Sequence, residues 1–155
     1  MKLSGETMKA GVSVALAAVA SYAHELAAPT LLLVLAMLTD YASGVSAAWM
    51  NRELSSRIGI VGILKKLAYL MVSAVAVMAD WLIRISAERF CPELADFCFF
   101  GILVMIWLIL NECISILENV SRMGIQIPEF LLVLMRRLKN NAEQKGDSML
   151  PKEKE

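Results

Sequence analysis

The sequence is poor in the residues that carry most catalytic and metal-binding chemistry. It has one histidine, His24, and three cysteines, none of them arranged as a CxxC pair. A zinc site needs a cluster of sulfur and imidazole ligands, so we expect no metal and interpret the cysteines as small apolar fillers. His24 stands near Ser21, but no motif makes that serine a nucleophile. We therefore expect no enzyme and no bound cofactor.

The chain also lacks a charge excess and a phosphate-binding loop. Fifteen Lys and Arg balance fifteen Asp and Glu, and the basic residues lie at the boundaries of hydrophobic segments. This distribution does not favour nucleic-acid binding. Gly59 and Gly62 fit a closely packed helix start better than a phosphate loop. No filter-like run of polar residues is present, which argues against a selective ion channel.

What the chain has in abundance is apolar surface. Hydrophobic residues make up 58% of the 155 residues, more than a soluble domain of this size can bury. The hydrophobic segments 29–50, 59–83 and 95–117 (or 97–117) each reach the roughly 20 residues that a spanning helix needs. The sequence therefore predicts an all-α membrane protein with these three transmembrane helices as its core, within residues 28–120.

An N-terminal hydrophobic helix is expected within residues 1–27, but its place is open. The segment 9–27 is rich in alanine, and His24 and Glu25 shorten its apolar part. It could be a fourth transmembrane helix, a helix lying on the membrane surface, or a cleaved signal with an A-x-A-like site in residues 19–23. In the first case the chain would cross the membrane four times.

After the core, Ile127 and Pro128 break the chain before a basic amphipathic helix, which we place within residues 121–140. Its basic residues Arg136, Arg137 and Lys139 suit the anionic inner leaflet, although the helix could instead pack on its own protein. Residues 141–155 are polar and charged, which predicts a disordered tail.

Orientation follows from lysine and arginine. Arg52 and Arg57 lie between the first two core helices, and several basic residues follow the third, whereas residues 84–96 carry two basic and three acidic residues. The first connection and the C-terminus should therefore be cytoplasmic. If residues 9–27 span, the N-terminus is cytoplasmic as well.

Asp40 lies near the middle of the first core helix, where an aspartate costs roughly 2.5 to 3.5 kcal/mol on insertion scales. Lys66 and Glu112 lie at similar depths on the next two helices, so an ion pair of Asp40 with Lys66, joined or contested by Glu112, is expected. These groups could satisfy one another within one monomer, or line a wet path between subunits. The small and polar residues on these helices give the full set of pore or helix-packing candidates: Asp40, Tyr41, Gly44, Gly59, Gly62, Lys65, Lys66, Ser73, Asp80, Asn111, Glu112, Ser115, Glu118 and Asn119.

Several of these residues also form a familiar pattern between residues 31 and 139. Its elements, in order, are Asp40-Tyr41-x-x-Gly44, Ala47-Ala48, Leu54-Ser55-Ser56, Gly59-x-x-Gly62-Ile63-x-Lys65-Lys66, Ile114-Ser115-Ile116-Leu117-Glu118-Asn119, Gly124 and Ile127-Pro128. Together they resemble the phage holin family that includes the toxin-secretion and phage-lysis holins. Ser43 departs from the threonine expected there, and the N-terminal segment lies outside the resemblance.

The resemblance implies a multi-pass protein of the bacterial inner membrane that forms a homo-oligomer in the lipid bilayer. It would permeabilise the membrane so that an endolysin or a secreted toxin is released or activated during lysis. The resemblance does not imply that the protein contacts either of them directly. The alternative is a small non-enzymatic accessory or anchoring subunit that binds a partner protein.

Overall fold

The computed structural model describes residues 3–89 and 99–149, which are almost entirely helical and contain no strand. The helices are α1 (Leu3–Met50), α2 (Ser56–Arg89), α3 (Phe100–Arg122) and α4 (Glu129–Met149). The all-α prediction is confirmed. Residues 90–98, which include Cys91, Cys98 and the expected start of the third core helix, lie outside the described residues, as does most of the predicted external connection.

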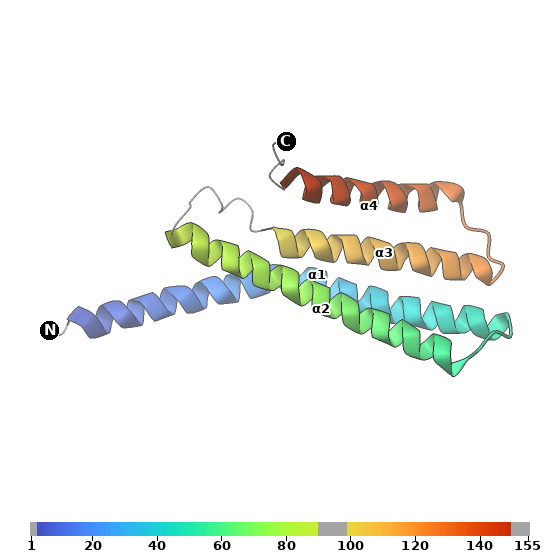
Figure 1. Cartoon of the computed structure of the whole chain (residues 1–155), viewed down its shortest axis with the longest axis horizontal. Coiled ribbons are helices and arrows are strands. Elements are labelled where there is room, and N and C mark those ends of the chain that lie inside the picture. The colour runs from blue at the N-terminus through green and yellow to red at the C-terminus, as the bar shows by residue number, and fades with distance from the viewer. Residues whose placement is uncertain (1–2, 90–98, 150–155) are drawn as a thin grey trace, which may run out of the picture.

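The predicted separate N-terminal helix is wrong, because residues 3–50 form one helix with Pro29 inside it. Proline removes one backbone hydrogen bond and crowds the preceding turn, which usually bends a helix rather than always ending it. The two halves of α1 accordingly point in different directions in Figure 1, and the N-terminal part extends away from the other helices. At about 1.5 Å per residue, α1 is far longer than a bilayer core of about 30 Å.

Three helical stretches are long and apolar enough to cross a membrane: Ala20–Met50, Gly59–Ser86 and Phe100–Arg122. They confirm the three core helices, although the first begins before Pro29. A fourth spanning helix is not found among the described residues, because residues 9–27 belong to α1 and the chain does not reverse direction before Met50. Large apolar side chains such as Leu38, Met71 and Leu82 cover the exterior of these stretches, as expected for a multi-pass membrane protein.

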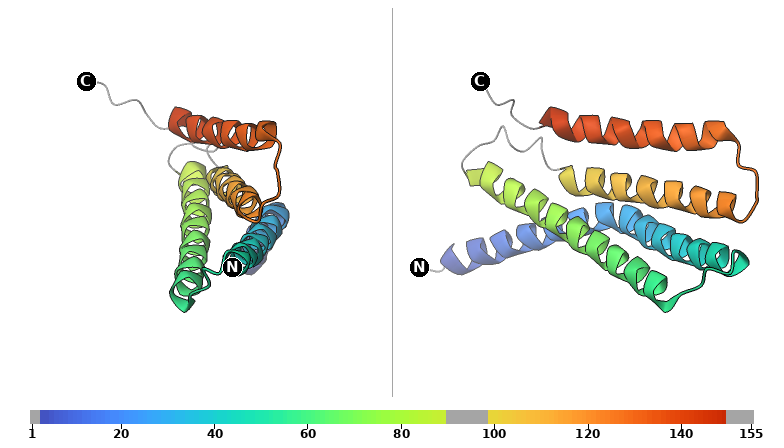
Figure 2. Two further views of the ribbon diagram at one scale, coloured as in Figure 1. Left: turned by 90° about the vertical axis from the view of Figure 1, so that its right-hand side faces the viewer. Right: turned by 45° about the vertical axis from the view of Figure 1, so that its right-hand side comes forward.

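The third helix, α3, lies at the centre of the arrangement. Figure 2 shows it between α1, α2 and α4, and it makes the main contacts of the structure with all three. The small core consists of Leu33 and Met37 on α1 and Met105 and Leu108 on α3, joined by side chains from the N-terminal half of α1. By contrast, α1 and α2 cross with little direct contact and diverge towards their connection (Figure 1).

The chain leaves α3 through Gly124, whose φ of +85° is a left-handed conformation typical of a helix end. Pro128 precedes α4, as the sequence predicted for a break. The predicted disorder from residue 141 onward is wrong as far as Met149, because α4 continues to that residue. Ala142, Glu143, Gln144 and Lys145 are strong helix formers, and Glu143 is also held by a hydrogen bond to Trp107 of α3.

Candidate functional site

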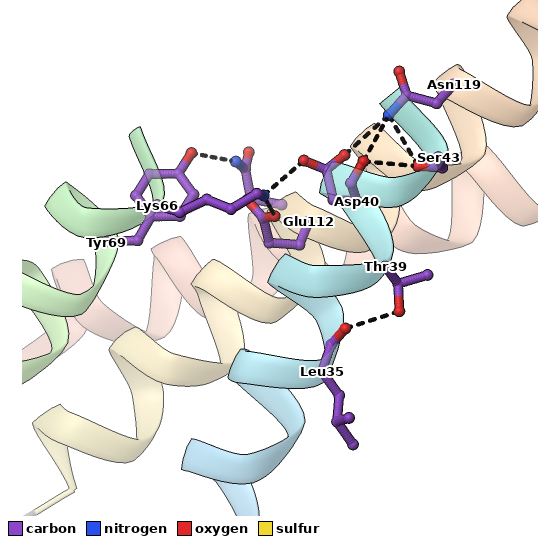
Figure 3. Close-up of polar contacts among 9 residues, drawn as sticks. Leu35, Thr39, Asp40, Ser43, Lys66, Tyr69, Glu112 and Asn119 are labelled. Atoms are coloured by element: carbon purple, nitrogen blue, oxygen red, sulfur yellow. Dashed lines mark hydrogen bonds and ion pairs between the residues drawn. The ribbon is translucent and has the colours of Figure 1, made fainter. Parts of the chain in front are cut away.

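A buried ionic cluster joins the three spanning helices. The ammonium group of Lys66 on α2 lies 2.8 Å from Oδ2 of Asp40 on α1 and also contacts Oε2 of Glu112 on α3. Figure 3 shows the lysine side chain pointing between the two carboxylates. The predicted pairing is therefore confirmed, with Glu112 as its third member.

Further polar groups surround this cluster. The Asn119 amide donates to Oδ1 of Asp40 at 3.1 Å and to the Ser43 hydroxyl at 3.1 Å (Figure 3). On the other side, the Asn111 amide donates to the Tyr69 hydroxyl at 2.7 Å. Among the described residues, no buried side-chain nitrogen or oxygen lacks a hydrogen-bond partner. The polar stripes thus satisfy one another within a single chain.

Because the cluster is largely buried, the loss of one of its charges should destabilise the protein. Glu112 is 1% exposed, and the side chains of Lys66 and Asp40 are 15% and 16% exposed. One lysine faces two carboxylates, so the cluster has more acidic than basic groups. Charges at this depth persist only when they are paired, because transfer of an unpaired ion from water is expensive. Both carboxylates therefore depend on Lys66 for a positive partner.

A groove of about 680 Å³ opens beside the cluster, where α1 and α2 diverge. Asp40 and Lys66 line its inner end, and Ser115 and Asn119 of α3 line its floor. Tyr41 extends across from α1 to α2. A Cβ atom added at Gly59 would lie 3.7 Å from its hydroxyl oxygen, and one added at Gly62 would lie 3.9 Å from its ring. The aromatic ring thus packs against the glycine positions of α2.

Gly44, a predicted helix-packing residue of α1, packs on its own chain. A Cβ atom added at Gly44 would lie 3.4 Å from Nδ2 of Asn119, so α3 approaches α1 closely at this level. Ala48, one turn further on, is buried. In the structure the neighbour of Gly44 is therefore α3 of the same chain.

A second polar site, around Asp80, lies near the start of α3. Its carboxylate is 1% exposed and accepts hydrogen bonds from the Phe100 and Gly101 backbone amides at 2.9 and 2.6 Å, and from the Tyr22 hydroxyl at 2.7 Å. Asp80 therefore satisfies the first amides of α3, whose helix dipole favours a negative charge there. A Cβ at Gly101 would lie 2.9 Å from this carboxylate, so a larger residue at this position would displace the Asp80 side chain.

Sequence reasoning placed Asp80 on a polar stripe but missed its partners. Tyr22 belongs to the segment that was treated as a separate helix. The other two partners are backbone amides, which almost every residue has, so the residue type does not reveal them. A glycine directly after Phe99 and Phe100, at the head of the most apolar run, was the available hint.

The remaining candidates lie outside these two sites. Ser73 is buried but donates to the carbonyl of Leu70 in its own helix, and Lys65 is exposed beside the Tyr69 ring. Glu118 on α3 contacts Arg136 on α4 at 3.5 Å, and Lys139 donates to Oδ1 of Asn111 at 3.1 Å. Arg137 is exposed. Within residues 3–89 and 99–149, no group of His, Cys, Asp and Glu side chains is arranged to hold a metal ion.

Known proteins are similar in sequence to this chain over most of its length. A protein of Clostridium perfringens, CPE0383, is 39% identical over 112 residues, which cover 72% of this chain and 76% of the relative. A 14.9 kDa protein of the nagH 3' region of the same species is 38% identical over 72% of this chain and 77% of its own length. A probable holin of Bacillus phage phi105 is 28% identical over 76% of this chain and 78% of the phage protein.

No solved structure matches the chain. The bacteriophage holin family matches residues 17–140, which include the whole ionic cluster, the Asp80 site and the N-terminal part of α4. The match begins before residue 31, where the resemblance of the sequence motifs began, and so includes Tyr22. The family indicates a non-enzymatic membrane protein. The chain belongs to the bacteriophage holin family.

Proposed function

We propose that this protein is a holin that assembles as a homo-oligomer in the bacterial inner membrane and permeabilises it. An endolysin or a toxin would then reach the far side of the membrane, with no direct contact required. The family match over residues 17–140 carries the proposal. The likeness to a probable phage holin supports it.

The distribution of polar groups is compatible with a pore only if several copies assemble. In one chain Asp40, Lys66 and Glu112 pair with one another, Asp80 is bound by the first amides of α3, and large apolar side chains cover much of the exterior. Three short helices with lipid-facing sides cannot also enclose a wide aqueous lumen. Oligomerisation should therefore precede leakage.

The test is induced expression in a bacterium, with membrane potential, membrane abundance of the protein and crosslinked species followed over time. We expect little effect until a threshold density, followed by abrupt depolarisation. Lysis should follow only when a cell-wall hydrolase is present inside the cell. An unrelated three-span protein at equal abundance is the control. A normal potential at high abundance of a stable monomer would favour the accessory or anchoring subunit instead.

Orientation gives a second measurable expectation. The connection between α1 and α2 carries Arg52 and Arg57, and α4 carries further basic residues, so we propose that both are cytoplasmic. With three crossings, the N-terminus is then external. In a background without native cysteines, an impermeant thiol reagent added outside should label a Gly11→Cys variant but neither Ser56→Cys nor Ser148→Cys. Labelling of Ser56→Cys in intact cells would contradict this orientation.

A further inference from the structure

The last helix, α4, covers one stripe of α3 along most of its length. Figures 1 and 2 show the two helices running antiparallel side by side. The Trp107 indole N–H donates to Glu143 at 2.8 Å, and the Lys139 ammonium lies 4.8 Å from the centre of the Trp107 ring. Closer to the C-terminal end of α4, a Cβ atom at Gly146 would lie 3.6 Å from the Leu103 side chain.

The α3 residues under α4 share one face of the helix. Leu103, Trp107 and Asn111 are four residues apart, and Glu118 follows at two further turns, so we call these four residues the α3 stripe. Three of them bind polar groups of α4, through Glu143, Lys139 and Arg136. Trp107 lies about 10 Å along α3 from Phe100, well inside the segment that can span a membrane.

From Arg137 onward, α4 does not suit lipid. Arg137, Lys145 and Asp147 are exposed, and each charge at the membrane centre costs roughly 2.5 to 3.5 kcal/mol on insertion scales. This docked arrangement of α4 therefore requires water on its outer side. When lipid surrounds α3, α4 should leave for the inner surface of the membrane, where its exposed apolar residues Phe130 and Leu134 can enter the interface.

Release of α4 would leave polar groups of the α3 stripe without their partners. The Trp107 N–H and the side-chain oxygen of Asn111 would then face an apolar environment, where interhelical hydrogen bonds favour association. A second copy presents the same groups. Asparagine has both donors and an acceptor, so two Asn111 side chains can pair across a two-fold axis.

We propose that the α3 stripe is the contact surface for a second copy of this chain, and that α4 occupies it until it is released. This inference rests on the proposed function, because it names the surface through which the oligomer assembles. In the released state α4 lies on the cytoplasmic side and the stripes of two copies meet.

A reversible lock tests the release of α4. In a background without native cysteines, Leu103→Cys and Gly146→Cys are joined by a short thiol-reactive crosslinker with a reducible bond, which holds α4 on α3. We expect the crosslinked protein to lose depolarising activity and oligomers, and a reductant added to the cells to restore both. Each single-cysteine variant, treated with the same reagent, is the control and should depolarise normally. Equal depolarisation by the locked and reduced proteins would overturn the proposal, as expected if α4 lined a pore.

A photocrosslink tests the contact between the α3 stripes of two copies without relying on permeabilisation. It also uses the unlocked protein, so the result does not depend on whether the locked protein enters the membrane. A benzophenone side chain replaces Trp107 in the unlocked chain, and the matched control places it at Met71, a strongly exposed residue of α2. We expect illumination of membranes to give a two-copy adduct from position 107 and none from position 71. Adducts from position 107 that are confined to the same chain's α4 would refute the contact. A two-copy adduct without depolarisation would retain the contact and reject the proposed function.

Discussion

Replacing Lys66 with methionine should destabilise the protein by about 3 to 5 kcal/mol, the range for removing one partner of a buried ion pair. The change leaves the carboxylates of Asp40 and Glu112 side by side without a cation, and Glu112 is almost fully buried. We expect a strong loss of folded protein and of assembly. The measurement is a titration of the purified protein with a denaturing detergent, followed by tryptophan fluorescence.

The neighbouring Lys65→Met variant is the matched control, because Lys65 is exposed and should tolerate the loss of charge within about 1 kcal/mol. Glu112→Gln should be milder than Lys66→Met, since Asp40 and Lys66 remain as one balanced pair. Combining Lys66→Met with Asp40→Asn should be less harmful than the sum of the two single changes. Strict additivity of that pair would show that the two side chains do not interact in the folded protein.

Replacing Asp80 with alanine should cost about 3 kcal/mol or more, because three donors lose their common acceptor. The Phe100 and Gly101 amides and the Tyr22 hydroxyl all bind this carboxylate, and an unsatisfied buried donor costs about 1 to 3 kcal/mol. The start of α3 should therefore fray. The same detergent titration measures the stability, and hydrogen exchange of the first α3 amides measures the fraying.

Two further variants serve as comparisons for the loss of stability in Asp80→Ala. Tyr22→Phe removes the hydrogen bond to Asp80 but leaves both amides satisfied, so we expect a loss of stability of about 1 kcal/mol. Asp147→Ala removes an exposed acidic residue of α4 and should leave stability and exchange at α3 unchanged. Unchanged amide exchange in the Asp80→Ala variant would contradict the assigned role of this carboxylate.

Hydropathy and residue spacing predicted the parts of the fold that depend on single segments. The apolar runs around Leu38, Met71 and Leu108 identified the three spanning helices, because a bilayer selects length and apolarity along one segment. The depth of Asp40, Lys66 and Glu112 also followed from the sequence, since helical rise converts residue number into distance. That common depth correctly suggested the ionic cluster.

Features that depend on the surroundings of a segment were predicted less well. Pro29 suited a helix start, yet flanking helical residues on both sides carry α1 through it. The polar run after Asn140 suited disorder, but Glu143 has a partner on α3 that no local pattern reveals. In both cases contacts or neighbouring turns outweighed the local preference of a few residues.

By itself, the sequence determined that this is a helical membrane protein of the holin family, which side chains are polar within its spans, and how deep they lie. Only the tertiary structure decided which groups meet: Lys66 with both carboxylates, Gly44 with Asn119, Asp80 with the first amides of α3, and α4 with the α3 stripe. The reason is geometric. Periodicity specifies the face and depth of a side chain on its own helix, whereas its partner depends on how each helix is rotated and crossed against its neighbours.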